Sequence, residues 1–151
     1  NGPTPATLTL RSAIIRTYAG SIQDGSNPVH VTIRGPSTQR FTNLHAYTGT
    51  TRVEAGTFSL VTPGLLASPV LVTGGIFTGN GIVSNSVTVA AGVHQPGNPH
   101  GSMATGPYAL HPGGTLRISL EGTNASTQFN SLRSTGPVAP GAPVPKASRP
   151  S

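Results

Sequence analysis

The sequence predicts an all-β chain, built as an antiparallel β-sandwich of the immunoglobulin-like or jelly-roll-like type with extended N- and C-terminal arms. Three observations lead to this prediction. Gly, Pro, Ser and Thr occupy 70 of the 151 positions, and both Gly and Pro are unfavourable inside helices. Apolar residues recur at every second position, which is the period of a half-buried strand. Turn signals separate these short runs, as is typical of sandwiches and barrels.

Short alternating runs mark the expected strands. The first begins at Thr7, where Leu8 and Leu10 alternate with threonines. The later runs place Val, Ile, Phe or Leu at every second position, and these residue types favour strands because they pack well on a pleated surface. The later runs lie at 29–33, 58–60, 86–90 and 115–121, and the apolar pairs at 76–77 and 82–83 are further strand candidates.

Turn signals occur at short intervals between these runs. Asn80-Gly81 is the strongest, because both residues tolerate positive φ and apolar pairs flank them. It predicts a β-hairpin between residues 76–77 and 82–83. The other signals place Gly beside Asp, Ala, Pro or a second Gly, and they lie at 24–25, 35–36, 55–56, 63–64, 74–75, 91–92 and 112–114.

The composition divides the chain into three parts. Residues 1–5 are the expected N-terminal arm, and residues 6–134 carry the strand pattern of the expected sandwich domain. Residues 135–151 are the expected proline-rich tail, because proline removes donors from a strand ladder and favours polyproline II. Four prolines of this tail are expected to contact neighbouring subunits, namely Pro137, Pro140, Pro143 and Pro145.

Three segments of the chain resemble a known protein family. The segment 29–36 is a strand pattern that ends in Gly-Pro, 52–60 holds an Ala-Gly-Thr-Phe-Ser-Leu turn into a strand, and 86–92 closes on Val-Thr-Val-Ala-Ala-Gly. Over residues 28–92 the chain therefore resembles the carboxypeptidase-regulatory-like or PEGA-type immunoglobulin-like modules of bacterial surface proteins. The resemblance implies an immunoglobulin-like β-sandwich with a non-catalytic extracellular role, and it transfers no functional residues.

The charge of the chain is strongly positive. Nine Lys and Arg residues stand against three acids, which gives a net charge of +6. The arginines are dispersed and aromatic residues make up only 5% of the chain, whereas a nucleic-acid groove needs clustered cations beside stacking platforms. We therefore expect no nucleic-acid partner. An anionic surface polymer remains a possible partner for a chain with this positive charge.

The start and the composition of the chain bear on its location. The chain begins at Asn1 rather than at Met, contains no cysteine and is rich in Ser and Thr. These features predict an exported, processed chain that is extracellular or on the cell surface. The longest apolar run, residues 65–76, is interrupted by Ser, Pro, Thr and Gly, so we expect no membrane span. Asn124-Ala125-Ser126 fits the glycosylation pattern, which makes Asn124 a candidate glycosylation site.

Few residues are available for catalysis. Three acids spread along the chain argue against a glycosidase, because that chemistry needs two carboxylates that face one bond. No serine lies in a nucleophile-elbow context, and the lack of cysteine removes thiol nucleophiles. We therefore expect no enzymatic activity and no cofactor.

Histidines are the only candidate metal ligands in the sequence. His94 and His100 lie in one Gly/Pro-rich segment, and His111 follows shortly after. Three imidazoles could bind zinc or copper, so a copper or zinc enzyme is one alternative function. The chain nevertheless has no His-x-His pair, no Asp follows His111, and carboxylates that could orient the ligands are scarce. The expectation is that no metal is bound.

Together these observations predict a non-catalytic structural subunit of an extracellular assembly, a pilus-like filament or a surface layer. Copies of the chain would form a homopolymer through their arms or through donated strands, which convert an open sheet edge into a specific joint. The expected inter-subunit strand presents Leu8, Leu10 and Ile14 to a neighbour's groove. Two further alternatives are a virion coat or decoration protein and a polysaccharide-binding module, although the latter lacks any Trp as a platform.

Overall fold

The computed structural model describes residues 4–97, 99–125 and 127–140. These residues form fifteen strands and no helix, so the all-β prediction is confirmed. Every pairing between these strands is parallel. Parallel neighbours need a crossover connection, and here the chain supplies it by winding as a parallel β-solenoid. The predicted antiparallel β-sandwich, immunoglobulin-like or jelly-roll-like, is therefore wrong.

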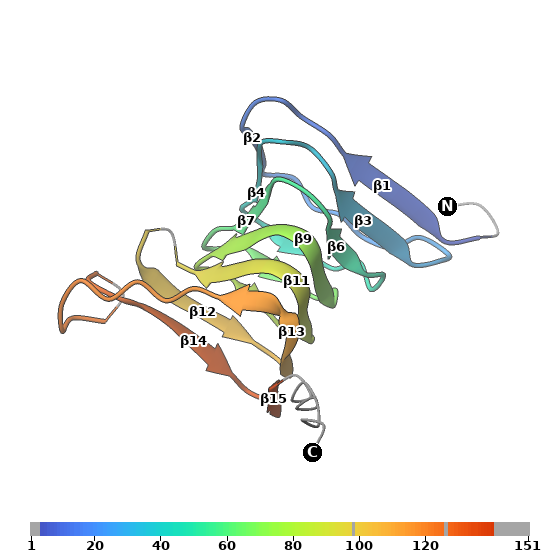
Figure 1. Cartoon of the computed structure of the whole chain (residues 1–151). Coiled ribbons are helices and arrows are strands. Elements are labelled where there is room, and N and C mark those ends of the chain that lie inside the picture. Colours follow the sequence, from blue (N-terminus) through green and yellow to red (C-terminus); the bar gives the residue numbers. More distant parts are fainter. Residues whose placement is uncertain (1–3, 98, 126, 141–151) are drawn as a thin grey trace, which may run out of the picture.

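Each turn of the solenoid adds strands to three faces, and neighbouring turns pair with one another (Figure 1). The first face holds β1 (Ala6–Leu10), β3 (Val29–Ile33), β6 (Thr51–Val53), β15 (Val138–Pro140) and the first halves of three long strands, β9 (Val70–Gly79), β11 (Val87–Pro96) and β13 (Tyr108–Leu116). The second face holds β2 (Arg16–Tyr18), β4 (Thr38–Phe41), β7 (Thr57–Leu60) and the second halves of these long strands. The third face holds β5 (Leu44–His45), β8 (Leu65–Leu66), β10 (Ile82–Val83), β12 (Gly101–Thr105) and β14 (Asn130–Ser134).

The alternation in the sequence is the alternation between the interior and the exterior of the solenoid. In β3, for example, Val31 and Ile33 are fully buried. Parallel and antiparallel strands share this period of two, so the alternation could not distinguish them. Asn80-Gly81 joins β9 on the second face to β10 on the third face, so this turn is a corner and the hairpin prediction is wrong.

Glycines stack at the corner between the first and second faces. Gly56 and Gly92 have φ values of 70° and 82°, which favour glycine. A Cβ atom on Gly56 would collide with the carbonyl oxygen of Gly35, and one on Gly92 would collide with that of Gly75. The Ala-Gly motifs behind the family resemblance are thus corners of one solenoid, with the corner at Gly75 between them. The immunoglobulin-like sandwich that the resemblance implies is therefore wrong.

Successive turns differ in length. Val70 pairs with Val87 in a short middle turn, whereas Tyr108 pairs with Val138 across a much longer last turn. The longer turn contains an excursion, residues 117–129, between β13 and β14. A variable turn length gives no fixed period in the sequence, which is why the alternating runs did not indicate a repeat architecture.

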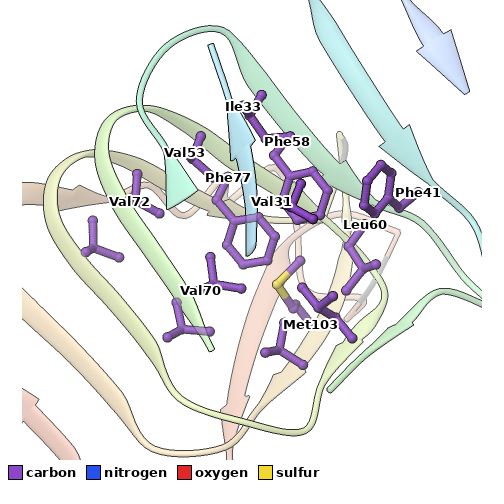
Figure 2. Packing of buried hydrophobic residues seen from close by; sticks show 14 of the residues in the cluster. Val31, Ile33, Phe41, Val53, Phe58, Leu60, Val70, Val72, Phe77 and Met103 are labelled. Carbon is purple, nitrogen blue, oxygen red and sulfur yellow. The ribbon is translucent and has the colours of Figure 1, made fainter. Parts of the chain in front are cut away.

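The solenoid interior is a stack of side chains with one layer per turn. Phe58, Phe77 and His94 follow one another in register on the second face. The ring centroids of Phe58 and Phe77 are 5.5 Å apart and those of Phe77 and His94 are 5.0 Å apart, each pair tilted by only 13°. Figure 2 shows Phe58 and Phe77 pointing into the interior, where Met103 of the third face also points. Stacked aromatic rings add to the stabilisation from burial.

Buried hydroxyl groups connect consecutive turns. The Tyr47 hydroxyl lies 2.5 Å from Thr51 Oγ1, which lies 2.5 Å from Ser68 Oγ. Each hydroxyl can donate one hydrogen bond and accept others, so the three groups satisfy one another. Burial raises the pKa of Tyr47 to about 12, so this phenol stays protonated and can donate.

Among the described residues, the first strand begins at Ala6 and the last strand ends at Pro140. The last strand, β15, therefore lies inside the segment expected to be a proline-rich tail. It pairs with β13 despite its prolines, because a proline still offers its carbonyl: Tyr108 N donates to Pro137 O at 2.9 Å. Residues 1–3 and 141–151, which hold most of the two expected arms, lie outside the described residues.

Candidate functional site

The solenoid has two ends, and Figure 1 shows β1 at one end and β15 at the other. At the first end, β1 pairs only with β3 and β2 pairs only with β4 among the described residues. Edge strands leave a row of backbone N–H and C=O groups unpaired. The first end is therefore an open sheet edge on two of the three faces.

The hydrogen bonds of β1 show which of its backbone groups are open. Ala6 donates its N–H and Leu10 offers its carbonyl to the segment around β3. Because alternate residues of a strand bond to the same side, Leu8 also faces β3. Thr7 and Thr9 then present their N–H and C=O groups to the open edge.

Side chains that belong to the solenoid interior are exposed at this end. Leu8 lies in register with Val31, and Tyr18 lies in register with Phe41. Val31 and Phe41 are 0% and 1% exposed, whereas Leu8 is 41% and Tyr18 is 42% exposed. A cavity of about 550 Å³ opens here, and its lining includes Leu8, Leu10, Tyr18 and Phe41. The first end is thus an uncovered cross-section of the core.

Two polar side chains take the place of the aromatic stack at the first end. Arg16 pairs with Gln39, which pairs with Phe58 of the next turn. Gln39 is buried, and its Nε2 has no hydrogen-bond partner among the described residues. An unpaired buried donor is unfavourable, so this amide is available to a group that covers the cavity. Arg11 also lines the cavity and adds a second cation to Arg16.

The last turn presents apolar side chains at the opposite end. Val138 pairs with Tyr108 and is 62% exposed, although Tyr108 itself is buried. Ile118 and Leu120 are exposed as well, but they lie on the excursion 117–129 and have no counterpart in the middle turns. Each end of the solenoid thus carries an exposed apolar side chain, Leu8 or Val138, in a column of residues that is buried in the middle turns.

The structure places the predicted inter-subunit residues at the first end. Leu8 and Leu10 lie in β1, and Ile14 is exposed in the connection between β1 and β2. Because β1 pairs with β3 of the same chain, it belongs to its own solenoid and has one edge free for a neighbour. The role of these three residues between subunits stays a prediction.

The four prolines predicted to contact neighbours are only partly within the described residues. Pro140 ends β15 and Pro137 precedes it, so both lie at the second end of the solenoid. Pro143 and Pro145 lie outside the described residues. The contact role of the four prolines also stays a prediction.

The three candidate metal ligands lie in different surroundings. His94 is fully buried, with Nδ1 3.1 Å from the Tyr108 hydroxyl and Nε2 3.3 Å from Met103 Sδ. Burial lowers the pKa of His94 to about 3, so the ring is neutral. His100 Nε2 lies 3.1 Å from Glu121 Oε2, and His111 is exposed on β13.

The structure gives these histidines no shared site. In the part of the chain that the structure describes, no group of three or more His, Cys, Asp or Glu side chains could hold a metal ion. Both ring nitrogens of His94 are already in contact with other side chains, those of Tyr108 and Met103. That the protein binds no metal stays a prediction, which elemental analysis of the purified protein would test.

The acids of the chain serve structural contacts. Asp24 accepts hydrogen bonds from the Thr48 side chain and backbone and from Val29 N, and the Thr48 hydroxyl is the main cause of its lowered pKa. Glu54 pairs with Arg34 and with Arg52, the latter at 3.0 Å. These two carboxylates are thus engaged in hydrogen bonds or ion pairs within the fold.

The candidate glycosylation site lies on the excursion between β13 and β14. Asn124 is exposed, and its carbonyl accepts a hydrogen bond from Gln128 N at 2.9 Å, which closes a turn. The side chain is therefore on an accessible loop of the last turn. Its modification stays a prediction.

Sequence reasoning missed several residues of the two ends. Tyr18 and Arg16 alternate with Thr17, which is a weak strand signal because the strand is so short. Gln39 precedes Arg40 in β4, where polar side chains hide the alternation. Val138 stands between prolines, and nothing in its local pattern indicates a strand.

Comparisons with protein-family models, with curated proteins and with solved structures find no match to this chain. The two ends are therefore identified by their geometry alone. The described part of the chain contains no helix that is long and apolar enough to span a membrane.

Proposed function

We propose that this chain is a non-catalytic structural subunit of an extracellular assembly, in which copies join through the open ends of the solenoid. The observation that carries this proposal is the uncovered first end, where core residues of β1 and β2 are exposed. An open parallel edge next to an apolar cross-section is a ready template for further strands. A second copy of the chain offers such strands with matching apolar residues.

The energetics of the first end support the same proposal. Fully burying one large apolar side chain contributes roughly 1.5–3 kcal/mol relative to leaving it exposed. Leu8 and Tyr18 are each about two-fifths exposed, and the cavity beside them is open. Covering this end would therefore bury several apolar groups at once and pair the open backbone of Thr7 and Thr9.

The proposal is tested by placing a charge at the open end. We expect Leu8→Asp to weaken assembly at least 100-fold. Burying an unpaired carboxylate costs several kcal/mol, and each increment of about 1.4 kcal/mol raises the dissociation constant tenfold. The monomer should keep its β spectrum in circular dichroism, since Leu8 lies in an edge strand. Sedimentation velocity and electron microscopy would follow the assembly across a concentration series.

Ile82→Asp is the matched control. Ile82 is 47% exposed, close to the value for Leu8, but it lies on the outer side of the third face in a middle turn. This variant should assemble as the wild type does. Wild-type protein that stays monomeric across the concentration series, or a Leu8→Asp variant that assembles normally, would contradict the proposal.

A further inference from the structure

We propose that the joint between copies is head-to-tail and in register, with β15 of one copy beside β1 of the next and Val138 opposite Leu8. This inference rests on the proposed function, and it specifies which surfaces meet. Leu8 and Val138 belong to one interior column of the first face. Leu8 begins the column, Val138 ends it, and the members between them are Val31, Thr51, Val70, Val87 and Tyr108.

The backbone of each turn bonds to the next turn in one repeated way. Each column residue from Val31 onward donates its N–H to the carbonyl that precedes its partner. These hydrogen bonds are 2.9–3.0 Å long and join the N–H of Val31 with the carbonyl of Thr50, Thr51 with Pro69, Val70 with Ser86, Val87 with Pro107, and Tyr108 with Pro137. By this rule the N–H and C=O of Val138 face the position of a following turn.

Around Val138, the open backbone of β15 matches the open backbone of β1. In β1, Thr7 and Thr9 face the free edge, and they flank Leu8. The Val138 N–H can therefore donate to the carbonyl of Thr7 in the next copy, and the N–H of that Thr9 can donate to the Val138 carbonyl. These two hydrogen bonds repeat the pattern that joins the earlier turns, and in that register Val138 lies opposite Leu8.

The side chains favour the same register. Val138 and Leu8 are both exposed in the single chain and both point along the interior column. The same register sets Pro140 opposite Leu10, which adds a second apolar pair. A slip of one residue would turn an apolar side chain outward and a threonine inward, because the side-chain period of a strand is two.

Stacking of unlike ends has a defined consequence for the assembly. The two contacting surfaces differ, so the contact does not close on itself and produces an open filament. The described residues place seven strands on the first face, and parallel strands lie about 4.8 Å apart, so these strands add roughly 33 Å per copy to the filament. Pairing of two β1 strands would instead give a closed dimer.

A pair of cysteines tests the register directly, because the chain contains none of its own. Thr9 and Ala139 are exposed, and the proposed register sets them opposite each other on the outer side. Their Cα atoms would be about 4.8 Å apart, which is within the range of a disulfide. We expect the Thr9→Cys, Ala139→Cys protein to form a ladder of covalent multimers after oxidation, seen on non-reducing gels.

The matched control is the Thr7→Cys, Ala139→Cys protein. Thr7 lies on the same edge of the same strand, but its Cα would be roughly 8 Å from that of Ala139, which is too far for a disulfide. We expect at least ten-fold less covalent multimer from this pair. An equal mixture of the two single variants, Thr9→Cys and Ala139→Cys, should give covalent dimers and no longer species.

The outcomes separate this inference from the proposed function. Assembly in sedimentation without the covalent ladder would overturn the register and leave the proposed function standing. Covalent dimers of the Thr9→Cys variant alone would also overturn it, because they indicate pairing of two β1 strands. Absence of any assembly in the wild type would overturn both.

Discussion

Replacing Phe77 by alanine is expected to lower the free energy of unfolding by about 3–5 kcal/mol. Phe77 is fully buried in a middle turn, and its ring stacks on Phe58 on one side and on His94 on the other. Truncation would remove both ring contacts and leave a cavity between two turns. Because each turn of a solenoid contacts only its neighbours, the damage should also reduce the coupling between the two halves of the chain.

Urea denaturation followed by circular dichroism, below the concentration of assembly, would measure this effect. Leu44→Ala is the control, because Leu44 is exposed on the outer side of the third face and its truncation should change stability by no more than about 0.5 kcal/mol. A Phe77→Ala protein that unfolds within about 1 kcal/mol of the wild type would contradict the role of the stack as the core of the solenoid.

The sequence predicted strands such as β3 and β11 but not how they pair, and it missed short strands such as β2 and β4. Val31 and Ile33 alternate with polar residues in the way that any half-buried strand requires, whichever direction its neighbour runs. The direction depends on where the chain goes after each corner. Asn80-Gly81 can turn a hairpin, but here it carries the chain to another face, and its two residues suit both geometries.

The candidate site was only partly predictable. Leu8 and Leu10 could be identified because their strand is regular and lies next to an expected arm. Val138 could not, since its partner Tyr108 lies a whole long turn earlier in the chain and the prolines around it suggest an unpaired tail. The Gly and Pro residues that follow His94 give no sign of a buried strand, whereas the register of β11 places this side chain in the core stack.

Acid is expected to destabilise the protein through His94. The ring is buried and neutral with a pKa of about 3, whereas an unfolded histidine titrates near 6.5. As the pH falls below 6.5, the unfolded chain gains a proton that the folded chain does not accept until about pH 3. Stability should therefore fall across this window, by about 3 kcal/mol at pH 4, and should be unaffected by His94 above pH 7.

The His94→Phe, Tyr108→Phe double variant isolates this contribution. It keeps a ring on Phe77 and removes the titrating nitrogen, and it also removes the Tyr108 hydroxyl that would otherwise lose its partner. His45 is buried as well, and burial lowers its pKa too, but it is present in both proteins, so the difference between them reports His94. Urea denaturation at pH 7 and pH 4 should show the double variant losing about 3 kcal/mol less than the wild type. Equal losses would mean that His94 is accessible to protons in the folded chain, which its place in the stack between Phe77 and Tyr108 does not permit.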